Sequence, residues 1–346
     1  MKLRDIEAQA ILIGFGSIGR IHLSQLEKRF QNIVVIDPKF EELENYDPLA
    51  LVEFYKSIEG LRFKSPPQLA IIANWGPDHL NSLIALQEIG VKNFIVEKPL
   101  VDSFADLYHL RDLVRNNNLN VVVNHQNSYS YLPELISELS SRFNIGSPLH
   151  LSAFGGAKCI ATIGIHYLSL ASKIFKSRPV HTSSRLHSSP INPRAPHLAY
   201  IGGSAVWEFE NQRFISLNFS NSSQVNNRLE ILFHNALATI EEASIELHGI
   251  PLSRQPSRLK PTHTEYATQL LYSGNPFIFP SGENGLDRIY NMVAAKDPKL
   301  DAFDHGFGAT EDLLATLLAN DENQGISLPI NLDPSHSKYF KKWHIS

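Results

Sequence analysis

The chain has 346 residues, more than one hydrophobic core usually supports, so we expect two domains. Hydrophobic residues make up 43% of the sequence and charged residues 19%, a balance that allows a buried core and argues against extensive disorder. The net charge of −4 lacks the basic excess of nucleic-acid-binding proteins, although Arg254, Arg258 and Lys260 form a local basic group.

A single cysteine, Cys159, excludes an internal disulfide and a cysteine-based zinc site. The 15 histidines are scattered without the tight spacing of a metal site, so we expect no bound metal. The apolar run Ala10–Ile13 is too short for a signal peptide, and no stretch approaches the ~20 apolar residues of a membrane helix. We therefore expect a cytoplasmic protein that binds neither nucleic acid nor membranes.

Short apolar runs alternate with helical patterns in the first third of the chain, which is typical of a parallel sheet covered on both faces. The helical periodicity directs Ile18, Ile21, Leu26 and Phe30 inward, and Asp78 is placed to cap a later helix. In chain order, we expect a strand at 10–13, a helix at 17–30, strands at 33–36 and 69–73, a helix at 79–89, and strands at 94–96 and 121–123.

From about residue 125 the strands become longer, and polar and apolar residues alternate in them, which favours an antiparallel sheet with one solvated face. Segments 204–210 and 214–219 form an expected hairpin joined at Asn211-Gln212. Further strands are expected at 228–233, 238–240 and 244–248, a loop at 250–263, and helices at 286–295 and 311–319.

These patterns predict an α/β protein. Its N-terminal domain, residues 1–124, is a Rossmann fold with a doubly wound parallel sheet. Residues 125–330 form an α+β domain with a large, mostly antiparallel open sheet, and residues 331–346 form a C-terminal tail. The exposed face of the second sheet predicts a homo-oligomer, either a dimer or a tetramer.

The segment Gly14-Phe15-Gly16-Ser17-Ile18-Gly19 fits the G-x-G-x-x-G pattern between an expected strand and an expected helix. The first glycine permits the tight turn, the second lets a pyrophosphate approach the backbone, and the third allows close packing of helix and strand. The phosphates would lie at the helix N-terminus, where free N–H groups favour anions. A glycine-rich turn in another kind of βαβ unit is the competing interpretation.

Asp37 ends the second expected strand, about twenty residues beyond the glycines, where a carboxylate binds the ribose hydroxyls. A carboxylate also repels the 2′-phosphate of NADP, so we expect NAD as the cofactor. The nearby Lys39 weakens this discrimination.

A second group of residues comprises Asn74-Trp75-Gly76-Pro77-Asp78-His79, Gly90 and Glu97-Lys98-Pro99-Leu100. Their order resembles the glucose-fructose oxidoreductase / inositol dehydrogenase / MocA family, which shows a turn with proline and histidine, a helix ending in glycine and a strand ending in Glu-Lys-Pro. Similarity at 124–133, 164–166, 311–319 and 325–329 extends the resemblance over most of residues 8–330. It implies that Asn74, Trp75, His79, Glu97 and Lys98 contribute to the cofactor site, although Trp75 could instead fill space at a domain junction.

Lys98 follows a predicted parallel strand, at the edge where open α/β sheets bind ligands. A lysine there can hydrogen-bond the reacting oxygen and offset its developing negative charge. The resemblance implies that Lys98 is catalytic or substrate-binding. Without the resemblance, a surface lysine before a proline turn is an equal alternative.

His166 is the expected proton carrier, because imidazole titrates near neutral pH and the family has a histidine at this position. With Thr162, Ser169 and Lys173 it shares one face of a predicted helix, which by itself could be a solvated polar face. Many family members carry Asp four residues before this histidine and Asp three residues after it. Thr162 and Ser169 stand there instead, so the usual carboxylate comes from another group, the chemistry is altered, or activity is lost.

Further expected substrate contacts are His125, Asn127 and Thr162; for Asn127 a loop-capping role is equally possible. Arg194 and His197 occupy a proline-flanked loop that we interpret as facing solvent. By resemblance, the protein transfers a hydride between nicotinamide and a hydroxyl or keto carbon of a sugar, inositol, amino sugar or nucleotide sugar. An NAD-dependent glycoside hydrolase and a non-catalytic NAD-binding regulator are the alternatives, and Thr162 gives weight to the latter.

Overall fold

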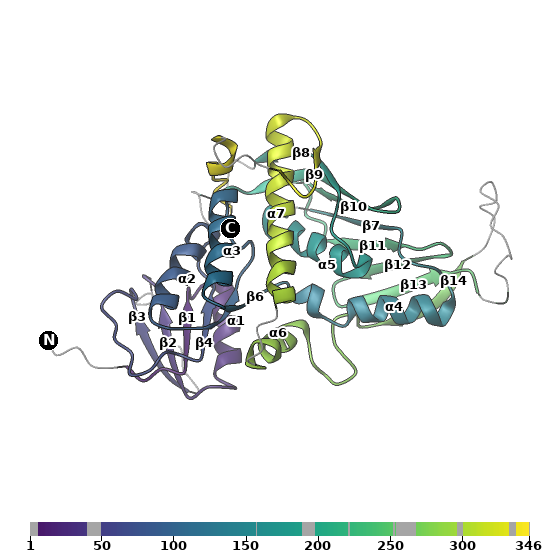
Figure 1. Cartoon of the computed structure of the whole chain (residues 1–346). Helices are drawn as coiled ribbons and strands as arrows, with labels where there is room; N and C mark the ends of the chain where they lie inside the picture. The colour runs from purple at the N-terminus through teal and green to yellow at the C-terminus, as the bar shows by residue number, and fades with distance from the viewer. Residues whose placement is uncertain are drawn as a thin grey trace. The chain divides into compact units, whose positions relative to one another are not determined.

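The first sheet of the computed structural model (Figure 1) is built mainly from buried apolar strands. The six strands run parallel in the order β3-β2-β1-β4-β5-β6, which confirms the predicted Rossmann fold. An edge strand, β3, was not expected, because its residues are mostly half-exposed and form no continuous apolar run. The strands are β1 (Ala10–Ile13), β2 (Asn32–Ile36), β3 (Leu51–Tyr55), β4 (Leu69–Ile72), β5 (Asn93–Val96) and β6 (Asn120–Val123).

The structure describes residues 6–39, 50–156, 158–188, 198–220, 222–251, 253, 268–295, 300–331 and 337–345. The basic group Arg254, Arg258 and Lys260, the pair Arg194 and His197, and most of the expected loop 250–263 lie outside these ranges. No helix within them is both long enough and apolar enough to span a bilayer.

Helix α1 (Ser17–Leu26) ends four residues earlier than predicted, and its buried face is also different. Gly19, His22, Leu23 and Leu26 are buried at the i, i+3, i+4, i+7 spacing of a helical stripe. The prediction that Ile21 points inward is wrong: this side chain is 49% exposed, because it lies off that stripe.

Helix α2 (His79–Glu88) follows a 3-10 turn, Gly76–Asp78, that runs directly into it. Asp78 occupies the N-cap position with helical backbone angles and makes no side-chain capping bond, so its predicted capping role is wrong. Helix α3 (Phe104–Asn116) was not expected; Ser103 caps it by accepting from the Asp106 N–H.

The second sheet has nine strands in the order β14-β13-β12-β11-β7-β10-β9-β8-β15, and its only parallel pairing among the described strands is β7 with β10. Asn211 and Gln212 both adopt positive φ in the predicted hairpin, which is confirmed. The strands are β7 (His150–Gly155), β8 (His181–Ser188), β9 (Ile201–Phe209), β10 (Arg213–Phe219), β11 (Arg228–Leu232), β12 (Ala236–Glu241), β13 (Ser244–Gly249), β14 (Gln269–Gly274) and β15 (Ile326–Ser327).

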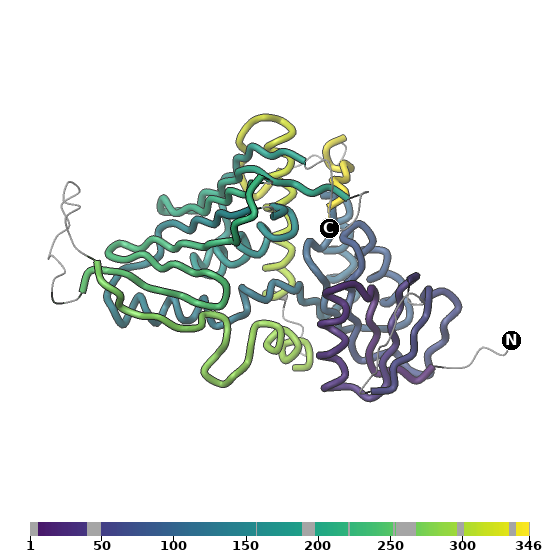
Figure 2. The backbone as a smooth tube through the Cα atoms, turned by 180° about the vertical axis from the view of Figure 1, so that it is seen from behind, coloured from purple at the N-terminus to yellow at the C-terminus, as the bar shows by residue number. Residues whose placement is uncertain are grey.

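Helices α4 (Leu132–Phe143) and α5 (Ile165–Phe175) cover one face of this sheet (Figure 1), whereas the view from behind shows the strands uncovered (Figure 2). Phe154, Phe214 and Leu232 are 37–45% exposed at alternating positions of neighbouring strands. The expected open sheet with one solvated face is therefore present, and part of that face is apolar.

The chain divides into two units that are not contiguous in sequence. The first comprises residues 1–124, 289–310 and 339–346, and the second comprises 125–288 and 311–338. Segment 289–310, expected in the 125–330 domain, and segment 339–346, expected in the C-terminal tail, thus group with the parallel sheet. Asn120 donates to the carbonyl of Val293 in helix α6 (Gly285–Ala294), and the N–H of His344 donates to Asp102 at 3.0 Å.

Helix α7 (Leu300–Glu322) begins eleven residues before the expected start at 311. Gly306 and Gly308 weaken the helical pattern over that stretch. The structure explains Gly306, because a Cβ there would collide with the side chain of Val123 in β6. The glycine therefore serves close packing of the helix on the strand.

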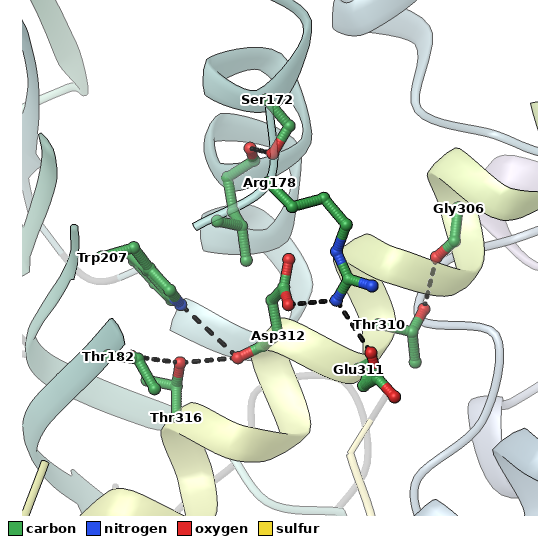
Figure 3. Close-up of polar contacts among 10 residues, drawn as sticks. Ser172, Arg178, Thr182, Trp207, Gly306, Thr310, Glu311, Asp312 and Thr316 are labelled. Atoms are coloured by element: carbon green, nitrogen blue, oxygen red, sulfur yellow. Dashed lines mark hydrogen bonds and ion pairs between the residues drawn. The ribbon is translucent and has the colours of Figure 1, made fainter. Parts of the chain in front are cut away.

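Arg178 anchors the part of α7 that belongs to the second unit (Figure 3). Its guanidinium donates to Glu311 at 2.8 Å and to Asp312, and both carboxylates are buried. The backbone oxygen of Asp312 accepts from Thr316 Oγ1 at 2.8 Å. Burial raises the pKa of Asp312 to about 7 even though Arg178 lowers it.

We expect Arg178→Met to lower the free energy of unfolding by about 3 kcal/mol, at the low end for a broken buried pair because the Arg178 side chain is 41% exposed. A carboxyl whose pKa is raised on folding contributes stability at low pH that is lost as pH rises. Without Arg178 the pKa of Asp312 is raised further, so more stability is lost as pH rises. The difference in unfolding free energy between the wild type and Arg178→Met, measured by urea unfolding, should therefore be larger at pH 8 than at pH 5.

Arg115→Met is the matched control, because Arg115 pairs with Asp304 at 3.1 Å on the surface. We expect a change below about 1 kcal/mol with little dependence on pH. Equal deficits for the two variants would contradict the assignment of Arg178 as a structural anchor.

Candidate functional site

In the glycine-rich turn between β1 and α1, two glycines leave no room for a side chain, whereas Gly16 does. Gly14 has φ +90, and a Cβ there would lie 2.6 Å from the backbone of Ala73 and Asn74. A Cβ at Gly19 would collide with the carbonyl oxygen of Gly14, whereas one at Gly16 would meet nothing within 4 Å. The open position is the one at which the sequence pattern expects a pyrophosphate.

Asp37, at the end of β2, is held against this turn. One carboxylate oxygen accepts from the Phe15 N–H at 2.7 Å and the other from the Lys39 N–H at 2.8 Å. Each oxygen retains a second lone pair with which it can accept from a ribose hydroxyl. The strand order reverses between β1 and β4, the position at which doubly wound sheets bind ligands.

Asn74 follows β4 at the same edge. Its Nδ2 donates to Ser82 Oγ at 2.9 Å, and its Oδ1 is buried without a hydrogen-bond partner among the described residues. Such an orphaned acceptor beside an open turn fits a bound dinucleotide. Trp75, the next residue, is half-buried at the start of the 3-10 turn.

His79 is almost fully buried, and its ring joins two loops. Nδ1 lies 3.0 Å from the carbonyl oxygen of Pro99 and 3.2 Å from that of Leu100, and Nε2 lies 3.2 Å from that of Asn74. Burial lowers the pKa of His79. The expected contact of this ring with the cofactor stays a prediction, and its enclosure by backbone carbonyls argues against it.

Glu97 is buried at the end of β5 and is ionised. Its Oε1 lies 3.0 Å from His22 Nε2 and accepts from Asn124 Nδ2 at 2.5 Å. Burial would raise the pKa of Glu97, but the hydrogen bond and charge of His22, with help from Lys98 and Asn124, lower it to about 2. A fixed negative charge therefore adjoins Lys98.

Lys98 stands out by its exposure. From Phe94 to Phe104 every other residue is buried, whereas Lys98 is half-exposed. The flanking residues hold the backbone, and the lysine is the one side chain of this segment that can reach a ligand.

In the second unit, the structure brings His125 and His166 together. Their ring centroids lie 5.9 Å apart with the planes at 85°; His125 is fully buried and His166 is half-buried. Ser128, just after His125, has its Oγ 2.6 Å from the Oγ of Ser169 on α5. This bond fixes the two histidine-bearing segments side by side.

Thr162 and Ser169, the two positions at which the sequence resemblance led us to expect Asp, are both buried. Thr162 lies in a π-helical turn, Ile160–Gly164, that precedes α5. The predicted polar helix face is therefore only partly solvated, since His166 and Lys173 are half-exposed. Neither replaced position supplies a carboxylate to His166.

Asn127 borders a small cavity of about 60 Å³, enough for a few water molecules. Polar side chains surround it together with aliphatic side chains and two aromatic rings. The lining residues are Asn127, Tyr167, Leu170, Asn227, Leu229, Ile240, Glu242 and Phe277.

The sequence interpretation missed His22 and Tyr290. Tyr290 in α6 places its hydroxyl 3.0 Å from His22 Nδ1, deep in the first unit. His22 follows Gly19 by three residues, so both lie on the helix face that packs on the sheet, and this spacing was the available signal. Lys98 and His166 belong to different units, and their convergence on one substrate stays a prediction.

Comparison with known proteins identifies relatives of this chain in sequence and in fold. Residues 9–125 match the sequence model of an oxidoreductase family described as having an NAD-binding Rossmann fold. No protein with a curated description matches the chain in sequence.

Solved structures share the whole fold. An NAD-binding protein from Listeria innocua is 16% identical, with a TM-score of 0.69 over 94% of this chain and 97% of that one. Myo-inositol 2-dehydrogenase from Lactobacillus plantarum is 15% identical, with a TM-score of 0.65 over 94% and 99% of the two chains. A super-repressor mutant of Gal80p from Saccharomyces cerevisiae is 13% identical, with a TM-score of 0.65 over 94% and 98%.

We expect Gly16→Val to abolish most NAD binding measured by calorimetry, because a side chain would fill the open position of the turn. The variant should fold normally, since nothing lies within 4 Å of the added Cβ. Ile21→Val, on the exposed face of the same helix, is the control and should bind NAD like the wild type. Unchanged affinity in folded Gly16→Val would rule out this turn as the pyrophosphate site.

Proposed function

We propose that this chain, which belongs to the glucose-fructose oxidoreductase / inositol dehydrogenase / MocA family of NAD-binding oxidoreductases, transfers a hydride between nicotinamide and a hydroxyl or keto carbon of a polyol. Lys98 carries the proposal: a half-exposed lysine in a buried segment, beside an ionised carboxylate, at the ligand-binding edge of the sheet. The substrate class, a sugar, inositol, amino sugar or nucleotide sugar, follows from the family.

The residues have complementary parts in this reaction. When bound, the nicotinamide accepts or supplies the hydride. Lys98 hydrogen-bonds the reacting oxygen and stabilises the negative charge that develops on it. His166 takes up or returns the hydroxyl proton, and the neighbouring ring of His125 helps to fix its orientation.

We expect Lys98→Met and His166→Asn each to lower kcat by about 10²–10⁴-fold, the usual contribution of a proton-transfer group, and to leave NAD affinity nearly unchanged. The double variant should lose less than the product of the two effects, because both residues serve one transition state. Rates would be measured with whichever inositol, sugar, amino sugar or nucleotide sugar the wild type turns over.

Lys92→Met is the control for a lost surface lysine, because Lys92 is exposed and its Nζ donates to the backbone oxygen of Asn117 at 3.3 Å. It should retain full activity. Full activity in Lys98→Met would contradict the dehydrogenase mechanism. If Lys98→Met loses activity and His166→Asn does not, His166 has no part in the mechanism.

NAD is the proposed cofactor, with NADP disfavoured by the charge of Asp37. The two backbone hydrogen bonds to this carboxylate hold it in place, so it cannot turn away from a 2′-phosphate without losing them. We expect Asp37→Ser to reduce or reverse the preference for NAD over NADP, measured in parallel titrations with the two cofactors. Tighter binding of NADP by the wild type would show that Lys39 or another cation dominates.

A non-catalytic, NAD-binding regulator is the second candidate. It is favoured by the buried Thr162 and Ser169, because neither residue offers His166 a carboxylate. The fold also occurs in a super-repressor mutant of Gal80p. NAD binding without turnover of any polyol in a broad panel would favour the regulator. Turnover of one of them would exclude it.

A cytoplasmic homo-oligomer, dimer or tetramer, completes the proposal. The uncovered face of the second sheet supports assembly, because Phe154, Phe214 and Leu232 expose apolar surface there. Light scattering at micromolar concentration tests it, and a monomeric mass would contradict it.

A further inference from the structure

The segment that carries Lys98 is held on both sides by buried histidines of the first unit. His22 contacts Glu97, which precedes the lysine, and His79 contacts the carbonyl oxygens of Pro99 and Leu100, which follow it. His79 reaches only the backbone, whereas His22 reaches a charged side chain. The two imidazoles therefore act on the lysine by different means.

The polarity of the His22–Glu97 contact follows from the charge of the carboxylate. An ionised carboxylate only accepts hydrogen bonds, so His22 Nε2 carries the hydrogen and donates it to Oε1. On the other side of the ring, Nδ1 faces the hydroxyl of Tyr290, which can donate or accept. Asn124 donates to the same Oε1, so two donors, one on α1 and one just beyond β6, converge on one oxygen.

We propose that His22 is a positioning residue for Lys98: by donating to Glu97 it limits the pull of that carboxylate on the lysine ammonium. The proposal rests on the assignment of Lys98 as the ligand-facing lysine. A buried carboxylate needs donors or a cation to offset its desolvation. If His22 is lost, the nearest cation is Lys98, and the lysine is drawn toward Glu97 and away from the substrate side.

The charged and titratable groups that face Glu97 come from several elements. They are His22 on α1, His79 on α2, Lys98 beyond β5, and Tyr290 on α6, whose ring lies under the guanidinium of Arg29. Among the described residues, the side chains that hydrogen-bond Glu97 are His22 and Asn124. These two donors are therefore the ones whose removal should strengthen the interaction of Glu97 with Lys98.

The reactivity of Lys98 toward acetic anhydride, followed at each pH by peptide mass spectrometry, tests this without substrate or cofactor. The midpoint of labelling is the pH at which acetylation of Lys98 is half-maximal. Glu97→Gln removes the adjacent negative charge, and the midpoint should fall by about one pH unit, because a nearby opposite charge raises the pKa of an ammonium by about 1–3 units. His22→Phe should raise the midpoint, because Glu97 then pairs more closely with Lys98. The double variant should behave like Glu97→Gln.

Three further variants make the result decisive. His22→Gln keeps a donor and should restore the wild-type midpoint, whereas Leu23→Val disturbs the same buried helix face and should not move it. Asn124→Ala removes the second donor and should shift the midpoint in the same direction as His22→Phe, which keeps the test available if that variant does not fold. An unchanged or lowered midpoint in His22→Phe and Asn124→Ala would overturn the proposal.

Kinetics separate this inference from the proposed function. If both are right, His22→Phe lowers kcat while the NAD affinity and the KM stay close to wild type, and His22→Gln recovers the rate. If the protein turns over no polyol, the labelling shifts still stand, and only the dehydrogenase assignment fails.

Discussion

A single buried negative charge organises the nucleotide-binding unit. Moving a carboxylate into a protein interior costs several kcal/mol unless donors or cations offset it. The partners of Glu97 are His22 on α1, Asn124 just beyond β6, and Lys98, the next residue. Tyr290 extends the set to α6 through His22. The helix that begins at the glycine turn, the strand end that presents Lys98 and a helix from late in the chain are thereby tied to one carboxylate.

The sequence was informative where a local pattern has a single structural outcome. Continuous apolar runs separated by helices specified the parallel strands, and the glycine spacing specified the turn, because a side chain at position 14 or 19 would collide with backbone. The pattern failed at Ile21, where the choice between two possible helix faces depends on the sheet against which the helix packs. It also failed at Gly306, where tertiary packing against Val123 overrides low helix propensity.

The candidate site was predictable only to the extent that it is carried by short motifs. Short sequence patterns identify the glycine turn, Asp37 and the Glu-Lys-Pro segment. In contrast, His22 and Tyr290 are 268 positions apart and come into contact only in the folded unit. In the second unit, the approach of His125 to His166 depends on the Ser128–Ser169 bond between a 3-10 turn and α5. No periodicity in the sequence encodes such a contact.

The discontinuity of the first unit has a consequence for synthesis. Ile345 is fully buried, and the backbone N–H groups of Trp343 and His344 donate to Asp102, next to the segment that carries Lys98. Because the chain is made from its N-terminus, the Rossmann sheet can form early on the ribosome, but Tyr290 and residues 343–345 reach it only after residues 125–288 of the second unit have been synthesised. Until then, the nascent unit lacks the contact of His22 with the Tyr290 hydroxyl and the cover of residues 343–345 over Asp102. In this state chaperones and proteases can act on it before the site is complete.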